Sequence, residues 1–359
     1  MNFREHNLSA MVDHFASGCK KEKLFGLELE HFVVDVKTKR TLPYFDGVEA
    51  ILKKFALLYG EPVYSNSSPS HIIGINGQNA AITLEPAAQL EISIAPSSDV
   101  SKIRLVYDEF EKLLRPILEE HDCELICVGY HPKSKVDELP LIPKARYGFM
   151  DSYFKTVGTR GKYMMKGTAA TQVSIDYESE ADFIKKFRVA NIIGPFLSKI
   201  FDNTEVFEGQ PYEGKLARTY IWNDVDADRS MVVAGALDKP NFGFYDYAEY
   251  IYNTPPIFIL ENGQEKFTGP VPASEIFANR AMTQKDIEHV ISMAFPDVRL
   301  KTNLELRTVD SVPIADAIRY TKLLGLIFYD QNNLDTLYED SLDVGNIQVA
   351  DLKERLMNS

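Results

Sequence analysis

The stretch Ile82–Pro96, ITLEPAAQLEISIAP, constrains the fold most, because polar side chains interrupt an aliphatic pattern at strand spacing. Glu85, Gln89 and Glu91 stand between the aliphatic residues. Alternate side chains of an extended chain share a face, so Gln89 and Glu91 point the same way. Pro86 bends the strand and weakens this inference for Glu85. A half-solvated antiparallel strand has the same alternation, so this stretch alone does not decide between a site and a solvated face.

Three further segments repeat this combination of an aliphatic face and a polar face. They are Leu24–Asp35, Thr171–Tyr177 and Leu300–Asp310. Alternation groups Glu28 with Glu30 in the first segment, Gln172, Ser174 and Asp176 in the second, and Asn303, Glu305 and Arg307 in the third. If the four strands join one sheet, their polar faces converge on a concave site.

Carboxylates gathered on one face of a sheet repel each other. Two of them about 4 Å apart cost roughly 4 kcal/mol at an effective dielectric constant near 20. A divalent cation is the natural counter-charge. Oxygen ligands without a nearby Cys or His pair favour Mg²⁺ or Mn²⁺ over Zn²⁺. We therefore expect a metal site here rather than solvated strand faces.

The composition is that of an ordinary globular protein, with 359 residues, of which 45% are hydrophobic and 25% charged. The net charge of −13 argues against nucleic acid or an anionic membrane surface as the main partner. No apolar run has the length of a membrane span, and the first residues lack the apolar core of a signal peptide. Cys19, Cys123 and Cys127 form no CxxC motif. We expect one catalytic domain over residues 1–359, a monomer or homodimer in a reducing cytoplasm.

Hydrophobic spacing and turn residues predict most of the remaining elements. Helices are expected at Asn2–Ser17, Asp46–Tyr59, Asp99–His121, Ser179–Ile200, Phe242–Thr254, Gln284–Ala294, Ile314–Tyr329 and Asp343–Met357. Further strands are expected at Cys123–Tyr130 and Pro255–Leu260. Asn76-Gly77 is the best hairpin-turn signal, and His131–Arg146 is the clearest loop.

Two segments invite a ligand-binding interpretation. Asp151–Gly167 combines glycines with four basic residues, among them Lys162 and Lys166. Each residue alone is typical of a solvated loop, but together they suit a nucleotide-phosphate contact. With the neighbouring Gln172 and Ser174 they form the predicted ATP-binding set. Asn223–Arg229 has DxDxD spacing, but Arg229 and Gly235 stand where a calcium loop needs Gly and Glu, so an acidic turn is expected.

The chain contains no GxxxxGK[ST] loop, no GxGxxG after a strand, no HExxH and no GxSxG. An ATP-using enzyme of this kind must hold the phosphates with metal ions and scattered basic residues on a sheet. Segments from Phe25 to Asp310 resemble plant-type glutamate–cysteine ligases: GLELEHF, TLEPAAQLEIS, YMMKGTAATQVSIDYESEADFIKKFRVA, FDNTEVFEG, LARTYIWNDVDADRS and RLKTNLELRTVD.

This resemblance implies an α+β fold, with a glutamine synthetase-like, antiparallel, saddle-shaped sheet and helices packed on its outer side. It also implies ATP-dependent joining of the γ-carboxylate of L-glutamate to the amine of L-cysteine through γ-glutamyl phosphate, the first step of glutathione-type thiol synthesis. The carboxylates that match the family hold two or three Mg²⁺ ions around the ATP phosphates in such enzymes. They are Glu28, Glu30, Glu85, Glu91 and Glu305.

The arginines of such enzymes grip substrate carboxylates, and Arg218 and Arg307 are the candidates here. Gln89, Trp222 and Arg229 complete the predicted substrate-binding set.

The sequence departs from the family at Ala87-Ala88, where the relatives commonly have Gly-Gly. Two alternatives stay open: a sister ligase that joins glutamate to a different amine, and a non-catalytic relative that binds cations or amino acids. The targeting extension of a plastid enzyme is also missing from this sequence.

Overall fold

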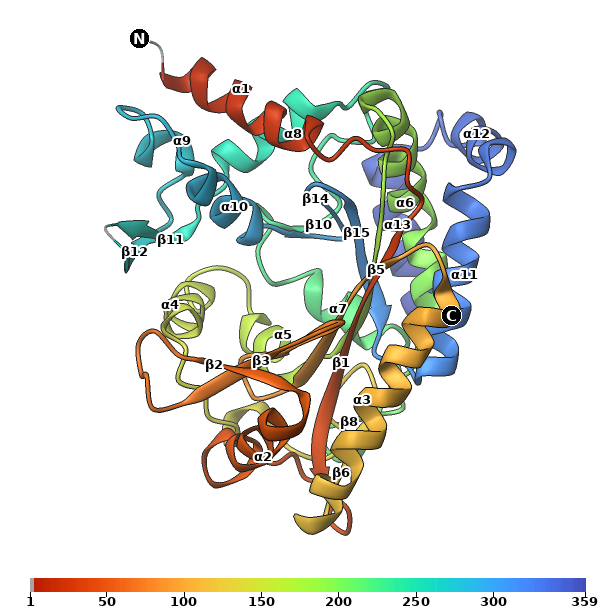
Figure 1. Cartoon of the computed structure of the whole chain (residues 1–359). Coiled ribbons are helices and arrows are strands. Elements are labelled where there is room, and N and C mark those ends of the chain that lie inside the picture. The colour runs from red at the N-terminus through yellow and green to blue at the C-terminus, as the bar shows by residue number, and fades with distance from the viewer. Residues whose placement is uncertain (1–2, 262) are drawn as a thin grey trace.

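The computed structural model describes residues 3–261 and 263–359. Within them, the centre of the molecule is an antiparallel sheet of nine strands in the order β14-β15-β7-β1-β5-β4-β3-β2, with β6 paired to β1 (Figure 1). The strands are β1 (Phe25–Asp35), β2 (Gly60–Tyr64), β3 (Ile72–Gly77), β4 (Ala80–Leu84), β5 (Leu90–Ser97), β6 (Cys123–Ile126), β7 (Ala170–Ile175), β14 (Val298–Leu300) and β15 (Leu304–Asp310). The expected α+β class with a large antiparallel sheet is confirmed.

The polar-faced segments come together as neighbours in this sheet. The order β15-β7-β1-β5 places all four side by side. Glu28 lies opposite Gln172 on one side and Ser93 on the other, and Glu30 lies opposite Glu91. Because directly opposed residues of an antiparallel pair point to the same face, the polar residues share one surface, as the alternation predicts.

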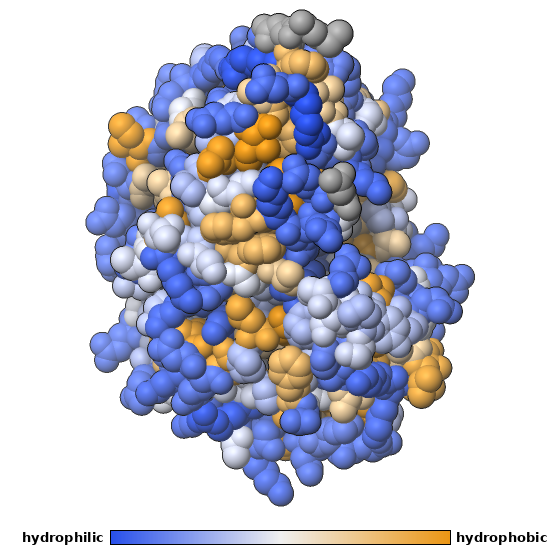
Figure 2. Space-filling model, turned by 90° about the vertical axis from the view of Figure 1, so that its left-hand side faces the viewer, coloured by the Kyte–Doolittle hydropathy of each residue, from blue (hydrophilic) through white to orange (hydrophobic). Residues whose placement is uncertain are grey.

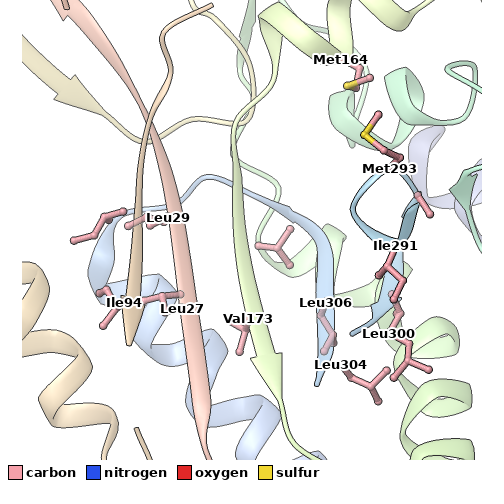
Figure 3. Packing of buried hydrophobic residues seen from close by; sticks show 14 of the residues in the cluster. Leu27, Leu29, Ile94, Met164, Val173, Ile291, Met293, Leu300, Leu304 and Leu306 are labelled. Atoms are coloured by element: carbon pink, nitrogen blue, oxygen red, sulfur yellow. The ribbon is translucent and has the colours of Figure 1, made fainter. Parts of the chain in front are cut away.

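The aliphatic side chains of the same strands form the opposite face. Leu27 on β1, Val173 on β7 and Leu306 on β15 are cross-strand neighbours and lie side by side (Figure 3). Helices α3 (Val100–Glu120), α6 (Glu180–Ile200) and α11 (Ile314–Phe328) contact β5, β15 and β1, and Figure 1 shows them together on one side of the sheet. Removal of this apolar surface from water is the main force that holds the two layers together.

Two more helices lie outside this helical layer: α12 (Gln331–Asp340) and α13 (Asn346–Met357). On the polar side of the sheet lie α4 (Ala145–Phe154), α5 (Gly161–Gly167) and α7 (Ala217–Trp222). The remaining elements are α1 (Phe3–Ala16), the π-helix Tyr44–Val48, α2 (Glu49–Tyr59), the 3₁₀-helix Val136–Glu138, β8 (Val206–Phe207), β9 (Gln210–Pro211), β10 (Ser230–Met231), α8 (Phe244–Asn253), β11 (Ile257–Glu261), β12 (Gln264–Gly269), α9 (Ala273–Ile276), α10 (Gln284–Ser292) and β13 (Phe295–Pro296).

The side of the molecule away from α3, α6 and α11 is mainly hydrophilic, with apolar groups only in small clusters (Figure 2). No helix in the described ranges is long and apolar enough to cross a membrane.

All eight predicted helices are present, with ends that differ by a few residues from the expected ones. Asn2 lies outside the described residues. Capping fixes two of the boundaries: Asp99 accepts a hydrogen bond from the Ser101 amide (2.9 Å), and Ser179 accepts one from the Asp182 amide (3.2 Å).

Several boundaries differ from the expectation because of turns. Ile82–Pro96 is a hairpin of β4 and β5, since Glu85–Gln89 forms a turn closed by the Glu85 amide and the Gln89 carbonyl (2.9 Å). Leu300–Asp310 is likewise a hairpin, so Asn303 lies in the turn between β14 and β15 rather than on the polar strand face. The β3–β4 hairpin exists, but Asn76-Gly77 ends β3 and the turn falls at 78–79.

The prediction of a basic loop at Asp151–Gly167 was wrong. Residues 151–154 end α4, and α5 covers Gly161–Gly167. Met164 and Met165 are buried there against the polar side of the sheet, so tertiary packing overrides the low helix propensity of the glycines. Helix α12 was not predicted. The acidic turn at Asn223–Arg229 is confirmed, because the Asp226 carboxylate binds the Asp228 amide (3.0 Å) and the Arg229 side chain (2.6 Å).

Candidate active site

A chain of hydrogen bonds crosses the polar face of the sheet. The Glu30 carboxylate accepts from the amide nitrogen of Ala170 (2.7 Å) and from Nε2 of Gln172 (2.9 Å). Oε1 of Gln172 accepts from Nη1 of Arg307 (2.5 Å), which also donates to Glu305 (2.8 Å). Strands β1, β7 and β15 are thus connected by one continuous network of polar side chains.

Four of the predicted metal ligands have no ion-pair partner. In the described part of the chain, no basic side chain forms an ion pair with Glu28, Glu30, Glu85 or Glu91. Burial, together with Glu305 and Glu91, raises the pKa of Glu28 to about 7. Burial and the Glu85 carboxylate also raise the pKa of Glu30 and of Glu91. Thr83 (2.8 Å) and Ser93 (3.0 Å) donate hydrogen bonds to Glu91 but bring no positive charge.

Glu305 differs from those four carboxylates. It is fully buried and forms ion pairs with Arg299 (2.7 Å), Lys301 (2.6 Å) and Arg307 (2.8 Å). Although burial opposes ionisation, these three cations hold the pKa of Glu305 well below its usual range. The structure therefore gives Glu305 a second possible role, as the anchor of Arg307. Its role as a metal ligand stays a prediction.

A small pocket of about 70 Å³ lies between the sheet and the wall formed by α4, α5 and α7. It brings together four of the five predicted substrate-binding residues and two of the five predicted metal ligands. Its lining includes Glu30, Glu85, Gln89, Gln172, Arg218, Trp222 and Arg307, with Pro86, Met150, Met164, Met165, Thr168 and Phe295. An apolar wall thus faces a floor of opposite charges, an arrangement typical of small-molecule sites.

A second cavity lies at the other end of the polar face. Glu28, Ser174 and Lys301 line it. The strands that form its floor carry small residues on this face, namely Gly26, Ala81, Ser93 and Ser174. The small side chains leave an open shelf on the sheet, so the polar face offers two neighbouring compartments, with the unpaired carboxylates along it.

Gln89 and Arg218 reach the pocket from opposite sides. The Gln89 side chain accepts from the Ala87 amide (2.9 Å) and donates to the carbonyl groups of Met165 (3.3 Å) and Thr168 (3.0 Å), so it ties the β4–β5 turn to α5. Arg218, only 4% exposed, comes from α7 and donates to the Val309 carbonyl (2.9 Å).

Three predicted residues lie elsewhere. Lys162 pairs with Asp137 (2.8 Å) at the surface, and Lys166 donates to the Leu139 carbonyl (2.8 Å). Arg229 is fully buried, bound by Asp226 and by the carbonyl groups of Pro255 and Met293 (2.8 Å each). None of the three lines either cavity on the polar face.

Comparison with known proteins identifies the chain's relatives. Residues 24–353 match the model of glutamate-cysteine ligase family 2 (GCS2). The chain belongs to this family. It is 30% identical over 346 residues to the chloroplastic glutamate–cysteine ligase of Brassica juncea and 31% identical over 360 residues to that of Nicotiana tabacum. These alignments cover 93% and 97% of this chain, but only 66% and 67% of the relatives, so the chain spans about two thirds of their length.

A weaker likeness links the fold to the crystal structure of the glutamate–cysteine ligase of Francisella tularensis in complex with AMP. The TM-score is 0.46 at 11% identity, covering 95% of this chain and 83% of that one.

The family implies divalent metal ions, for which the carboxylates of the polar face are candidate ligands. Buried carboxylates that face one another without cationic partners fit hard divalent cations, which prefer oxygen ligands. In the described ranges, however, no three Asp, Glu, His or Cys side chains approach closely enough to form a ready-made metal site. The residues therefore fit the charge of Mg²⁺, while the arrangement around an ion is not preformed.

The departure of this family member at Ala87-Ala88 has a visible backbone consequence. Ala88 adopts a positive φ of 67°, the left-handed conformation that glycine adopts freely. It sits in the turn between Glu85 and Gln89, both of which line the pocket. The alanine therefore keeps the backbone geometry that a glycine would have, at the cost of strain.

Four basic residues near the glutamates of the polar face were not predicted from the sequence. Arg299 and Lys301 reach Glu305 across the β14–β15 hairpin, so the turn at 301–303 was the signal needed to find them. Lys144 and Arg146, at the start of α4, are close enough to Glu85 and Tyr147 to interact with them. Burial lowers the pKa of Lys144 and the Glu85 carboxylate opposes this shift, while Arg146 opposes the raised pKa of Tyr147. No sequence motif marks these two, because only the packing of α4 onto the sheet brings them near.

Proposed function

We propose that this chain is an ATP-dependent ligase that joins the γ-carboxylate of L-glutamate to the amine of L-cysteine and releases ADP and phosphate. Membership of glutamate–cysteine ligase family 2 and the names of the plant relatives support this assignment. The single observation that carries it is the pocket in which Arg218 and Arg307 face Glu30 and Glu85. It offers cations for a substrate carboxylate beside anions for a metal–nucleotide complex.

The reaction needs an activated carboxylate, because oxide is a poor leaving group. Phosphorylation by ATP gives γ-glutamyl phosphate, which the amine attacks with loss of phosphate. The protein has little covalent chemistry to perform and must align the reactants and neutralise their charge. Arg218 and Arg307 bind and orient the amino-acid carboxylate. Glu28, Glu30, Glu85 and Glu91 would hold Mg²⁺, which neutralises the phosphate charge when bound.

The two compartments support a proposed order of the substrates along the sheet, with glutamate at one end and ATP at the other. The glutamate carbon chain belongs in the pocket with the arginines, whose apolar wall includes Met164 and Met165. The open shelf of Gly26, Ser93 and Ser174 has room for the nucleoside part of ATP. The phosphates then lie over Glu28 and Glu91, between the two compartments.

Lys162 and Lys166 stay proposed ATP ligands. Each must first leave its present partner, Asp137 or the Leu139 carbonyl. Glu305 as a metal ligand, Gln89 and Trp222 as substrate contacts, and Arg229 as a supporting residue are likewise proposals. So are the single catalytic domain over residues 1–359, the monomer or homodimer, and the cytoplasmic location. The relatives named above are chloroplastic.

A sister ligase with another amine acceptor is the second candidate. The strained Ala88 turn lies directly beside pocket residues Glu85 and Gln89, which is where a changed acceptor preference would arise. A non-catalytic relative is less favoured, because both arginines and all four unpaired carboxylates are retained on the polar side of the sheet, with Arg218, Arg307, Glu30 and Glu85 around one pocket.

Phosphate release separates the three possibilities. Purified protein receives ATP, Mg²⁺ and L-glutamate, and then one amine at a time. We expect release that depends on both glutamate and L-cysteine. Release with another amine at higher kcat/KM would identify the sister ligase. No release with any amine, despite saturable binding of glutamate, would identify the non-catalytic relative.

A further inference from the structure

Arg218 is held in place by an unusual local structure at the end of β15. Leu306 and Val309 are three positions apart in β15, but their partners in β7, Val173 and Thr171, are only two positions apart. A bulge of this kind turns carbonyl groups out of the ladder. The carbonyl groups of Arg307, Thr308 and Val309 all accept from Arg218, at 3.4, 3.2 and 2.9 Å.

These neutral acceptors do not balance the charge of a buried guanidinium. Arg218 forms no ion pair within 4.0 Å among the described residues. Burial lowers the pKa of Arg218, and the nearby Asp310 carboxylate is the largest influence in the opposite direction. Asp310 is itself only 4% exposed. Asp310 therefore supplies a buried counter-charge for the Arg218 guanidinium, which stays ionised in proteins, from beyond the 4.0 Å of a direct ion pair.

The Asp310 carboxylate is fixed by a turn that no step of the proposed reaction uses. The Asn203 amide (2.9 Å) and the Thr204 hydroxyl (2.8 Å) both donate to it. The preceding Asp202 carboxylate accepts from the amide of Leu216 (3.1 Å), two residues before Arg218. The turn at 202–204 thus connects Asp310 with the start of the helix that carries Arg218.

Gly129 completes this scaffold. A Cβ atom at position 129 would lie 2.1 Å from Oδ2 of Asp310 and 2.4 Å from Oγ1 of Thr204. Real side chains do not approach so closely, and the 129 backbone is tied to Asn203 and Ala169 by hydrogen bonds of 3.2 and 3.1 Å. Only glycine leaves room for the carboxylate here.

We propose that Asp310, held by the 202–204 turn and by the space at Gly129, is a positioning residue that keeps Arg218 and the start of α7 in place for the carboxylate of the amino-acid substrate. The inference rests on the proposed function, because it assigns Arg218 to that substrate. Arg218 lines the pocket, and its buried Nε has no hydrogen-bond partner in the protein, an unsatisfied donor of the kind found at functional sites.

The test compares KM for glutamate with KM for ATP. Asp310→Asn should raise KM for glutamate about tenfold and leave KM for ATP within about twofold. A factor of this size corresponds to weakening one charge-assisted hydrogen bond, here between Arg218 and the substrate carboxylate. Gly129→Ala, which displaces the same carboxylate without changing it, should act in the same direction. Thr204→Val keeps the Asp310 carboxylate and removes one of its hydrogen bonds, so it should raise KM for glutamate less. It is the substitute test if Asp310→Asn does not fold.

Asp286→Asn is the matched control. Asp286 is also a buried carboxylate near an arginine, Arg280, and here the two form a direct ion pair (2.9 Å). Asp286 belongs to the capping box of α10 and lines neither cavity of the polar face. It should lower thermal stability without separating the two KM values. In addition, the double variant Asp310→Asn with Arg218→Lys should raise KM for glutamate by much less than the product of the two single increases, because Asp310 acts through Arg218.

Titration of the protein with L-glutamate in the absence of ATP reports the same contact without turnover. Weaker glutamate binding by Asp310→Asn supports the inference even in a preparation that does not release phosphate. A folded Asp310→Asn protein with wild-type KM for glutamate, or with both KM values raised equally, would overturn it while the proposed function stands. Wild-type protein that neither binds glutamate nor releases phosphate would overturn both.

Discussion

At the scale of single residues, the site contains two kinds of buried carboxylate. Glu305 is neutralised by three basic side chains. Glu28, in contrast, faces Glu305 and Glu91 without an ion pair of its own in the described ranges, and its pKa is raised to about 7. A group in this second situation destabilises the fold that contains it, which is typical of residues retained for function.

Glu28→Gln should therefore lower activity about a hundredfold or more while raising thermal stability. Gln keeps the shape and removes the repelling charge. Because the folded pKa lies above the unfolded one, the penalty is absent below about pH 4.5, grows as pH rises, and is complete above about pH 7. The gain in midpoint temperature should thus be larger at pH 8 than at pH 4.5, as measured by thermal unfolding. Near-wild-type turnover at saturating Mg²⁺ would contradict the metal-ligand role.

Arg307→Lys should raise KM for glutamate far more than KM for ATP. Lysine keeps the charge but loses the planar fork that binds a carboxylate with two donors. We expect an increase of about tenfold or more, measured by steady-state kinetics with each substrate varied in turn. An unchanged KM for glutamate together with a raised KM for ATP would assign Arg307 to the phosphates instead.

At the scale of elements, the site depends on irregular points in the strands more than on the strands themselves. The turn at Glu85–Gln89 brings Glu85 to the pocket, and the bulge in β15 turns backbone carbonyl groups toward Arg218. The turn is strained at Ala88, whose φ is 67°. Left-handed backbone costs a non-glycine residue about 1–2 kcal/mol.

This strain can be measured by comparing two neighbouring substitutions. Ala87 and Ala88 are 2% and 1% exposed, so replacement by glycine removes one buried methyl group in each case and adds the same freedom to the unfolded chain. Only Ala88 of the two has a positive φ. Ala88→Gly should therefore leave the protein about 1–2 kcal/mol more stable than Ala87→Gly does, measured by denaturant unfolding. Equal effects of both substitutions would show that the turn is not strained.

The sequence predicted the regular parts of these elements and missed the irregular ones. Alternation reports which side chains share a face, so the grouping of Glu28 with Glu30 was correct. Alternation does not report where a strand turns back, so it predicts one strand at Ile82–Pro96 and one at Leu300–Asp310, where the structure has hairpins. The failure at Asp151–Gly167 has another cause, because buried methionines on α5 override local propensity.

At the scale of the whole molecule, four strands far apart in the chain meet as neighbours because each has one aliphatic face that must be buried. The helical layer covers those faces, and the polar faces are left together on the other side. The facing wall was not predictable: α7 and α4 bring Arg218 and Arg146 to the sheet through long-range packing that no local pattern records.

The assembled polar face also explains why no nucleophile or phosphate loop is needed. Its two compartments suit the proposed placement of an amino acid at one end and a nucleoside at the other, with the unpaired carboxylates along the face. In the proposed reaction, an oxygen of the glutamate γ-carboxylate attacks the γ-phosphorus of ATP and ADP leaves. The same oxygen then leaves with the phosphate when the amine attacks carbon.

The most direct test follows the oxygen atoms. L-glutamate labelled with ¹⁸O in its γ-carboxylate is incubated with the protein, ATP, Mg²⁺ and L-cysteine, or with the best amine from the phosphate-release assay. The isotope content of the released phosphate is then measured by mass spectrometry. Transfer through γ-glutamyl phosphate predicts one labelled oxygen in each phosphate released. Phosphate that carries no label, formed at the same rate as the amide product, would contradict the proposed mechanism.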